Sequence, residues 1–277
     1  MPCFVRSLIV FITIFCGFIL ETGCSREKIL RLKDKETIRW YQMIQDVKDK
    51  KIILIGKLQD EPKHQEYQLR VIKDLHEQGI PISIGLEMFR AKDQTVLDGW
   101  VAGNLTLDQF LSSNPYKPLP VYKDIFLFSK EKKVPLIGLT VPAEIPIRVA
   151  RTGFGSLSEG EIQQLPAGIS CNVDDTYREY IKRFYPSLRS GKEFTKFCEA
   201  QLIQDNAMAL YTLKYIEKYP RSTVIILSEY NRAWKRATPR QIERLHRSHT
   251  ICVILPELTK IERSIMTGED ADFLILK

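Results

Sequence analysis

Short apolar runs alternate with amphipathic segments over most of the chain. The runs are rich in Ile, Val and Leu, which predicts strands at 51–56, 82–87, 134–139, 223–227 and 250–255, with a last, edge strand at 272–276. Helical periodicity, cap residues and first-turn prolines predict helices at 62–79, 91–101, 106–113, 121–133, 143–152, 159–165, 174–185, 193–218 and 239–247. Strands and helices are therefore expected to alternate.

The predicted strands are apolar throughout, which is typical of a parallel sheet covered by helices on both faces. We therefore expect an α/β fold with a mostly parallel central sheet, in a domain spanning 51–277. Residues 153–200 contain no predicted strand and are expected to form a helical lobe. Ligands of such sheets bind at the carboxyl ends of the strands, so the segments that follow the core strands are the candidate site.

The N-terminal segment has the pattern of an export signal. An apolar run, Leu8–Leu20, follows a short positively charged start, and it is too short for a comfortable transmembrane helix. Residues 1–23 are therefore predicted to be a signal peptide. Cys24 directly after Thr-Gly resembles a bacterial lipobox, and its lipidation is preferred over an uncleaved anchor or a plainly secreted protein. We expect a lipid-anchored protein on the periplasmic face of a bacterial membrane, in the cell envelope, with 24–50 as tether and lead-in.

Composition narrows the classes of partner. The chain has 41 Lys and Arg against 34 Asp and Glu, a formal net charge of +7, and these charges are spread along the sequence. With no nucleic-acid motif, this excludes a nucleic-acid partner but is compatible with an anionic ligand or a membrane surface. Cys171, Cys198 and Cys252 lie beyond the signal and are expected to be buried small apolar side chains.

Segments at the predicted strand ends share an order and spacing with a known family. They are Gly56-Lys57-Leu58-Gln59-Asp60-Glu61-Pro62-Lys63-His64; Gly85-Leu86-Glu87-Met88-Phe89 with Gln94 and Leu97-Asp98-Gly99-Trp100; Pro135-Leu136-Ile137-Gly138-Leu139 and Val149-Ala150-Arg151-Thr152-Gly153; and Ala200-Gln201, Asp205 and Met208-Ala209. Together they resemble the ChaN-like haem-binding lipoproteins, which are related in fold to the Tiki metalloproteases. The resemblance covers about residues 51–257 and implies haem as the cofactor.

The sequence departs from that family at two motifs. The resemblance implies Gly-Glu-x-His after the first core strand and Gly-x-x-His after the fourth, but this chain has Gly56-Lys57-Leu58-Gln59 and Ser228-Glu229-Tyr230-Asn231. Divalent metals need converging imidazoles or carboxylates, whereas Gln59 and Asn231 offer amides and Lys57 adds a positive charge. We treat Lys57, Gln59 and Asn231 as degenerate metal positions, expect no stoichiometric divalent metal and disfavour an enzyme.

Four side chains with ligand chemistry remain near the strand ends, and each has two interpretations. His64, early in a helix, is either a neutral imidazole able to bind a ligand or a surface or capping residue. Glu87 is either a ligand-binding carboxylate or a structural one, which accepts backbone N–H groups at a strand end or pairs with Lys57. Gln201 and Asp205 share a helix face and either close the site from the lobe or bond to loop backbone.

The segment after the fourth core strand concentrates cations and aromatic rings. Arg232 and Lys235 suit carboxylates, and Trp234 offers a flat apolar face. This composition suits haem, an anionic lipid head group or an acidic partner, and the alternative is a solvated loop. Because haem iron accepts His or Tyr, the axial candidates are His64, Tyr67 and Tyr230.

Three functions remain open on this basis. The leading hypothesis is a membrane-anchored lipoprotein that binds haem or a similar planar anionic ligand in iron acquisition, with a homodimer as a compatible assembly. The second is a Tiki-like metal-dependent hydrolase with altered ligands. The third is a catalytically silent binding protein of the same fold. The residues themselves indicate only a ligand site at the strand ends.

Overall fold

The computed structural model describes residues 27–58, 61–113, 120–187, 191–258, 261 and 263–276, and its centre is an eight-stranded sheet of order β2-β1-β8-β7-β3-β6-β4-β5. Strands β3 to β8 pair in parallel, whereas β1 pairs antiparallel with both β2 and β8. The expected α/β fold with a mostly parallel sheet is therefore confirmed. The strands are β1 (Lys28–Arg31), β2 (Glu36–Arg39), β3 (Ile52–Lys57), β4 (Ile82–Arg90), β5 (Leu136–Thr140), β6 (Thr223–Glu229), β7 (Ile251–Pro256) and β8 (Phe273–Ile275).

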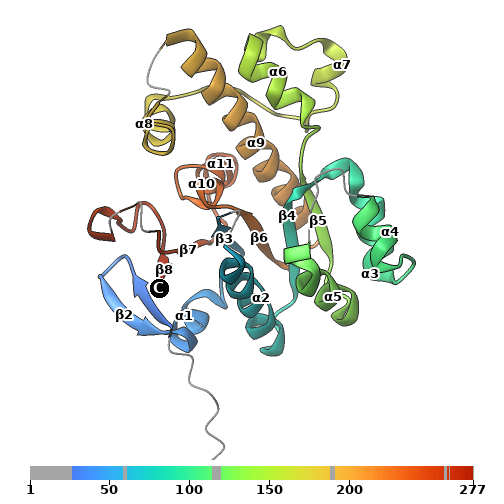
Figure 1. Cartoon of the computed structure of the whole chain (residues 1–277), viewed down its shortest axis with the longest axis vertical. Helices are drawn as coiled ribbons and strands as arrows, with labels where there is room; N and C mark the ends of the chain where they lie inside the picture. Colours follow the sequence, from blue (N-terminus) through green and yellow to red (C-terminus); the bar gives the residue numbers. More distant parts are fainter. Residues whose placement is uncertain are drawn as a thin grey trace, which may run out of the picture.

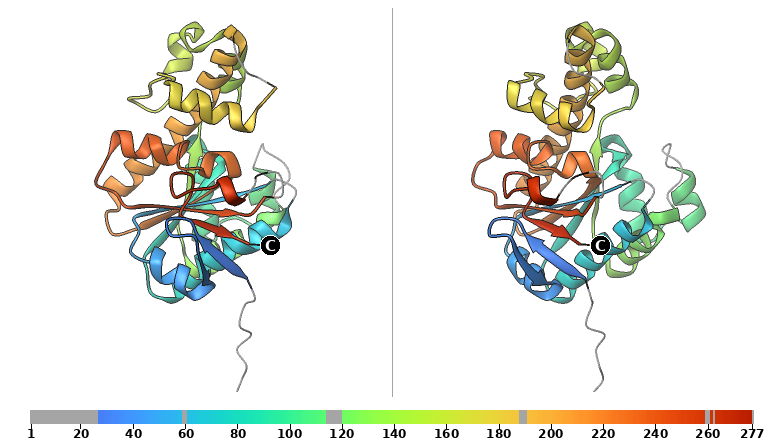
Figure 2. Two further views of the ribbon diagram at one scale, coloured as in Figure 1. Left: turned by 90° about the vertical axis from the view of Figure 1, so that its left-hand side faces the viewer. Right: turned by 60° about the vertical axis from the view of Figure 1, so that its left-hand side comes forward.

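Helices cover both faces of this sheet (Figures 1 and 2). One face packs against α1 (Trp40–Val47), α2 (Pro62–Glu77), α3 (Gln94–Ala102), α4 (Leu107–Ser112) and α5 (Lys123–Lys132). The other packs against α8 (Asp175–Phe184), α9 (Gly191–Lys218), α10 (Tyr230–Ala233) and α11 (Thr238–Leu245). None of these helices is long and apolar enough to cross a bilayer, within the part of the chain that the structure describes.

Strand β3 shows why the core strands are apolar at every position. Its side chains alternate between two cores: Ile53 and Ile55 belong to the core under α2, and Ile52 and Leu54 to the core under α9 to α11. All four are at most 1% exposed. Both faces of the strand are therefore buried, which is what a continuous apolar run indicates.

The helical lobe lies above the carboxyl ends of β4 and β5 (Figure 1). It contains α6 (Glu144–Thr152), α7 (Glu159–Ile162), α8 and the first half of α9, and it has its own small core around Ile145, Val149 and Ile203. Helix α9 is 28 residues long and continues from the lobe onto the sheet. It therefore joins the lobe to the edge of the sheet where ligands are expected.

The prediction of a charged tether is wrong for the residues just before the core domain. Within 24–50, strands β1 and β2 form a hairpin and α1 follows directly. Ile29 and Ile38 point inward and are at most 4% exposed, while the charged residues between them face solvent or pair with one another. The tether prediction counted charges and missed this alternation.

The hairpin also corrects the position of the last strand. Residues 272–276 were expected to form an edge strand, but β8 is hydrogen-bonded to β7 on one side and to β1 on the other. In Figure 1 the blue N-terminal hairpin lies beside the red C-terminal strand. The expected signal peptide at 1–23, the lipidation site Cys24 and Gln59 lie outside the described residues and stay predictions.

Candidate functional site

A cleft of about 830 Å³ lies at the carboxyl ends of β3, β4, β5 and β6, between the sheet and the lobe. Its position agrees with the rule for ligand sites in parallel sheets. The lining includes a polar set of residues at the strand ends and on α9, and an apolar set from the lobe, the ends of β4 and β5 and the segment before α5. We define the polar floor as Lys57, Glu87, Gln201, Glu229 and Arg232, and the apolar wall as Met88, Val121, Val141, Pro146, Ile147, Ala150, Phe197 and Ala200.

Arg232 organises the polar floor from the first turn after β6. Its Nε donates to Glu87 Oε1 at 2.7 Å, its Nη1 to Asp205 Oδ1 at 3.2 Å, and its Nη2 to Gln201 Oε1 at 2.9 Å. Its side chain is 8% exposed, and that of Asp205 is 2% exposed. The guanidinium therefore links the end of β4 to the middle of α9 and fixes the lobe helix over the sheet.

The two carboxylates around Arg232 have shifted pKa values. Burial raises the pKa of Glu87 and of Asp205, although the guanidinium opposes this shift in both cases. Burial alone would lower the pKa of Arg232, but the two carboxylates outweigh it and raise that pKa instead. The three groups form a mutually dependent buried network, whose charges are satisfied within the protein.

A second ion pair stands beside this network. Lys57 Nζ donates to Glu229 Oε1 at 2.9 Å and lies 5.5 Å from the ring centre of Tyr122. The backbone N–H of Glu229 donates to Glu87 Oε2 at 2.7 Å, which holds the end of β6 against β4. Lys57 therefore pairs with Glu229, and the expected pairing of Lys57 with Glu87 is wrong.

The apolar wall lines the same cleft as the ion pairs. Helix α6 presents Pro146 and Ile147, and α9 presents Phe197. Ile147 is 52% exposed and Val121 is 44% exposed, so both present apolar surface in the cleft. The cleft thus combines an apolar face with charged and hydrogen-bonding groups, as sites for amphipathic small molecules do.

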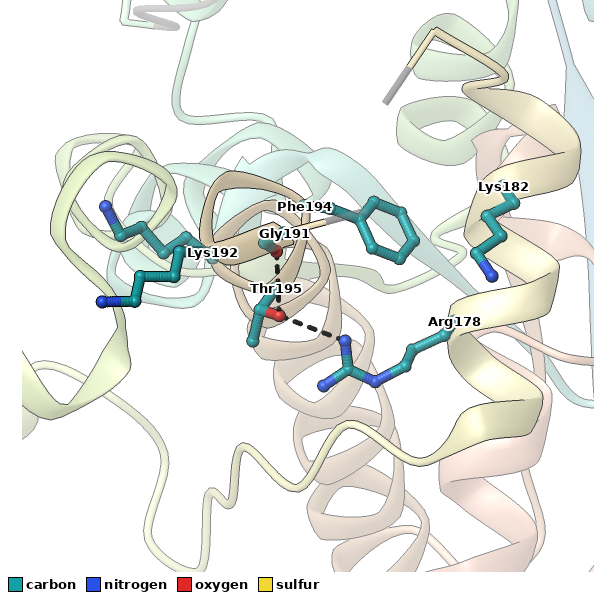
Figure 3. Close-up of a pocket in the computed structure, with 7 residues that line it drawn as sticks. Arg178, Lys182, Gly191, Lys192, Phe194 and Thr195 are labelled. Atoms are coloured by element: carbon teal, nitrogen blue, oxygen red, sulfur yellow. Dashed lines mark hydrogen bonds between the residues drawn. The ribbon is translucent and has the colours of Figure 1, made fainter. Parts of the chain in front are cut away.

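Another cavity, of about 610 Å³, lies on the lobe between α8 and the start of α9 (Figure 3). Its lining is rich in cations, and three of the four that the structure describes there have local partners. Arg178 donates to Thr195 at 3.1 Å, and Lys182 and Lys196 pair with the glutamates three residues before them. The described residues that line it include no carboxylate and no tyrosine, so the strand-end cleft is the stronger candidate.

Several predicted site residues do meet in the cleft. Glu87, Gln201 and Arg232 line it, as do the degenerate metal positions Lys57 and Asn231. Asn231 Nδ2 donates to Tyr185 Oη at 3.1 Å. Asp205 lies behind the lining and acts through Arg232, so the interpretation in which it closes the site from the lobe side holds only indirectly.

The structure does not bring His64 and Tyr67 to the cleft lining. His64 is 3% exposed, and its Nδ1 accepts the backbone N–H of Leu58 at 3.1 Å. It is therefore neither a surface residue nor a ligand in the cleft, and it holds the segment after β3 against α2. Tyr67 is 6% exposed and packs against Trp40, with 6.2 Å between ring centres.

The aromatic and cationic segment after β6 is also mostly structural. Tyr230 and Trp234 are at most 3% exposed and pack against each other, and Trp234 Nε1 donates to Asp270 at 3.0 Å. Lys235 Nζ bonds to Asp272 at 2.8 Å. Trp234 therefore offers no free face, and of the cations predicted there only Arg232 reaches the cleft.

Sequence reasoning missed Tyr122, Tyr185 and Ile147. Tyr122 and Tyr185 stand at helix boundaries, just before α5 and just after α8. Ile147 lies two positions from both Ile145 and Val149, so it cannot share their buried helix face. Its position away from the buried face of α6 was the one available signal that Ile147 is exposed. A single exposed aliphatic residue is common, so this signal alone does not indicate a binding site.

The chemistry of the donors argues against a metal centre. Among the described residues, no group of three or more His, Cys, Asp or Glu side chains converges as a metal site. The carboxylates of Glu87 and Glu229 line the cleft together, but each is already paired with a cationic side chain. Glu87 pairs with Arg232, and Glu229 pairs with Lys57. The fold and the cleft define an α/β protein with an amphipathic cleft, a candidate ligand site, between the sheet edge and a helical lobe.

The sequence model described as "Haem-binding uptake, Tiki superfamily, ChaN" matches residues 43–241. The chain therefore belongs to this family, and the expected resemblance is confirmed. No curated protein matches the sequence.

One of the solved structures that are similar to this chain agrees with the assignment at the level of the fold. A structure of ChaN of Campylobacter jejuni that shows cofacial haem binding has a TM-score of 0.67 and 18% identity, covering 90% of this chain and 95% of that one. A mutant of the erythromycin esterase EreC in its open conformation has a TM-score of 0.48 and 13% identity. The match covers 85% of this chain and 78% of the esterase chain. The type III effector HopBA1 has a TM-score of 0.44 and 11% identity, with 84% and 90% covered.

Proposed function

We propose that this protein binds haem in the strand-end cleft and works as a lipid-anchored haem carrier in iron acquisition. The observation that carries the proposal is the amphipathic cleft, whose lining combines the apolar wall with the polar floor. Haem has the same division, since an apolar ring carries carboxylates on one side. Membership of a haem-binding family and the haem-binding ChaN structure support the same ligand.

The residues of the cleft fit this ligand in size and chemistry. About 830 Å³ lies within the range of small-molecule sites. Ile147 and Phe197 would contact the ring, and Tyr185, a half-buried rim residue, is the proposed iron ligand in place of His64, Tyr67 and Tyr230. When bound, haem supplies an iron centre, while the protein orients the ring and excludes water from one face.

The location of the protein is part of this proposal. Residues 1–23 would be removed on export, and lipidated Cys24 would hold the domain on the periplasmic face of a bacterial membrane, in the cell envelope. Strand β1 begins at Lys28, so only a few residues separate the proposed anchor from the folded domain. A homodimer remains a proposal that solution mass measurements can test.

A haemin titration of the purified mature protein tests the proposal. A shifted Soret band with saturable, one-to-one binding is expected. Ile147→Arg should weaken binding at least tenfold because it places a charge on the apolar wall. The matched control is Ile162→Arg, since Ile162 is similarly exposed (46%) but lies on α7, outside the cleft.

The iron ligand has a separate readout. Tyr185→Phe should alter the absorbance spectrum of the haem complex, and the same change at Tyr211, a half-buried tyrosine outside the cleft lining, should not. Haemin that fails to bind, or that binds equally well to wild type and Ile147→Arg, would contradict the proposed function.

A further inference from the structure

The ion pair between Lys57 and Glu229 is asymmetric. Its Nζ–Oε1 distance is 2.9 Å, but the Lys57 side chain is only 6% exposed whereas that of Glu229 is 41% exposed. Lys57 is fixed in a buried strand end and needs an anion nearby. Glu229 has access to water and can release the ammonium without being left buried and unpaired.

The main chain of Glu229 is held independently of its side chain. Its backbone N–H donates to Glu87 Oε2 at 2.7 Å, and β6 continues in register with β3 up to this residue. Glu87 in turn is bonded to Arg232 at 2.7 Å. The Glu229 carboxylate can therefore turn toward solvent while the strand end and the Arg232 network stay in place.

Tyr122 supplies an unused hydrogen-bond donor at the same place. Its ring lies under Lys57 Nζ at 5.5 Å, and the residue is 3% exposed and lines the cleft. Its hydroxyl has no hydrogen-bond partner among the residues that the structure describes. Burial, with the charges of Glu229 and Glu87, raises the pKa of Tyr122, so the O–H remains protonated and able to donate. A buried donor without a partner is costly unless a ligand or water satisfies it.

We propose that Lys57 and Tyr122 form a subsite for a carboxylate of the ligand, and that Glu229 occupies this subsite until the ligand displaces it. The proposal rests on the proposed function, because it assigns the carboxylate side of the haem-like ligand to the polar floor. Glu229 is thus an internal competitor. It keeps the buried ammonium paired in the free protein and raises the selectivity of the cleft for ligands that bring their own carboxylate.

A carboxylate fits this subsite better than the other candidates. A metal ion would meet the ammonium of Lys57 at close range, and like charges in such a partly buried site repel strongly. A neutral ligand could bond to Tyr122, but it would not displace Glu229 from its ion pair with Lys57. Only an anion satisfies both the ammonium and the phenol. The side chain of Glu229 already places one planar carboxylate beside the ammonium of Lys57.

Benzoate and benzamide test the subsite without any porphyrin. They have nearly the same shape and differ in charge, so amide NMR shifts at residues 57 and 229 should respond to benzoate and not to benzamide. Glu229→Gln should tighten benzoate binding about two- to fivefold, because benzoate then no longer competes with the partly exposed carboxylate of Glu229 for Lys57. Tyr122→Phe should weaken it about threefold or more, through loss of one hydrogen bond.

Matched controls separate the subsite from general charge effects. Glu179→Gln removes an equally charged glutamate, paired with Lys182 on α8 far from the cleft, and should leave benzoate binding unchanged. Lys57→Met should abolish benzoate binding. If that variant fails to fold, Glu229→Gln and Tyr122→Phe still decide, because Glu229→Gln leaves an amide oxygen that can accept from Lys57 and Tyr122→Phe removes a hydroxyl that no described residue bonds to. Equal shifts with benzoate and benzamide, or weaker binding to Glu229→Gln, would overturn the proposal.

Protoporphyrin and its dimethyl ester then distinguish this proposal from the proposed function. The free acid should bind at least tenfold more tightly than the ester, and Glu229→Gln should widen that ratio. If acid and ester bind equally, the subsite is wrong and haem binding stands. If benzoate binds as expected but neither porphyrin does, the subsite stands and the proposed function is wrong.

Discussion

Arg232 is the residue on which the polar floor of the cleft depends. It bonds to Glu87 on β4 and to Gln201 and Asp205 on α9, and it is nearly buried. A guanidinium matches this arrangement because its fork presents several donors in one plane. Removing it would leave two buried carboxylates without their cation, which costs far more than losing an exposed pair.

Arg232→Met should therefore lower the free energy of unfolding by about 3–5 kcal/mol. Urea denaturation measures the change. The control is Arg244→Met, because Arg244 is 44% exposed and lies 3.7 Å from Asp174, and its loss should cost less than about 1 kcal/mol. Adding Glu87→Gln and Asp205→Asn to Arg232→Met should recover part of the loss, and a loss unchanged by these additions would contradict the argument.

The raised pKa of Glu87 gives a pH dependence of defined sign. Because burial raises this pKa above its ordinary value of 4.5, the folded protein binds the proton more tightly than the unfolded chain does. The group's contribution to stability is therefore largest at low pH and is lost as pH rises from about 4.5 through the raised value. The unfolding free energy of wild type minus that of Glu87→Gln should fall across this window and then level off.

Glu161 provides the opposite case in the same protein. Bonds from the Ser158 backbone N–H and hydroxyl lower the pKa of Glu161. The unfolding free energy of wild type minus that of Glu161→Gln should therefore rise with pH and level off above about pH 4.5. Urea denaturation over a pH series measures both, and a Glu87 difference that rises like that of Glu161 would refute the assigned direction.

Individual residues show where sequence reasoning about the site succeeds and fails. Glu87 and Gln201 were predictable because strand ends and a lobe helix converge on one edge of a parallel sheet. Trp234 and Lys235 were misjudged because their partners, Asp270 and Asp272, lie far away in the sequence. A local excess of cations does not reveal which of them are neutralised by the fold.

At the scale of elements, the end of β4 determines the shape of the cleft. The register of β4 with β5 shifts between Leu86 and Arg90, and this irregular stretch carries Glu87 and Met88 into the cleft lining. Such irregularities often redirect side chains beside binding sites. Gly138 on β5 makes the arrangement possible, because a Cβ there would lie 2.2 Å from the carbonyl oxygen of Arg90.

Gly138→Ala should therefore destabilise the protein by about 1–3 kcal/mol, since backbone atoms have to move to admit the methyl group. It should also weaken haemin binding, because the displaced segment carries two cleft residues. Gly155→Ala is the control, as no atom lies within 4 Å of its added Cβ and its φ is not positive. Equal stability of the two variants by thermal unfolding would show that β4 tolerates the shift.

The elements themselves were largely predictable, and the exceptions have a common cause. Apolar runs located β3 to β7, and α4 and α8, which Thr106 and Asp174 cap, lie within the ranges predicted for them. The short strands β1 and β2 and the four-residue α10 were missed. In segments so short, periodicity is weak, and tertiary pairing decides the conformation.

At the scale of the whole molecule, the hairpin β1–β2 and the lobe lie toward opposite ends of the long axis (Figures 1 and 2). The cleft lies on the lobe side of the sheet, where the strands end. A domain held through Cys24, just before β1, would thus carry its cleft on the side away from the membrane. Such an orientation suits exchange of a ligand with soluble or neighbouring proteins.

Cys24→Ala should move the protein from the membrane fraction to the soluble fraction. The reason is that, in the proposed lipoprotein, the lipid on Cys24 is the sole anchor, and this variant cannot carry it. Fractionation of cells, with Cys171→Ala as a control for loss of a thiol, measures this. If Cys24→Ala remains in the membrane fraction, the apolar run Leu8–Leu20 is retained as the anchor and the lipoprotein proposal is wrong.

The charge arrangement at the strand ends predicts the metal content of the whole protein. Elemental analysis after dialysis should find no stoichiometric divalent metal in the wild type, since Lys57 places a cation in the floor. The combined variant Lys57→Glu, Gln59→His, Ser228→Gly and Asn231→His should gain metal affinity. Stoichiometric metal in the wild type would favour the hydrolase hypothesis instead.

The pairing of β1 with β8 has a consequence for how the chain acquires its structure. Leu30 and Leu274 are partners in the sheet although nearly the whole sequence separates them. Contacts between such distant segments form late, because a very long loop has to close first. The first strand to be synthesised therefore waits for the last one. A nascent chain lacking residues 273–275 cannot pair the β1–β2 hairpin with the rest of the sheet, so this part of the fold forms only when translation is nearly finished.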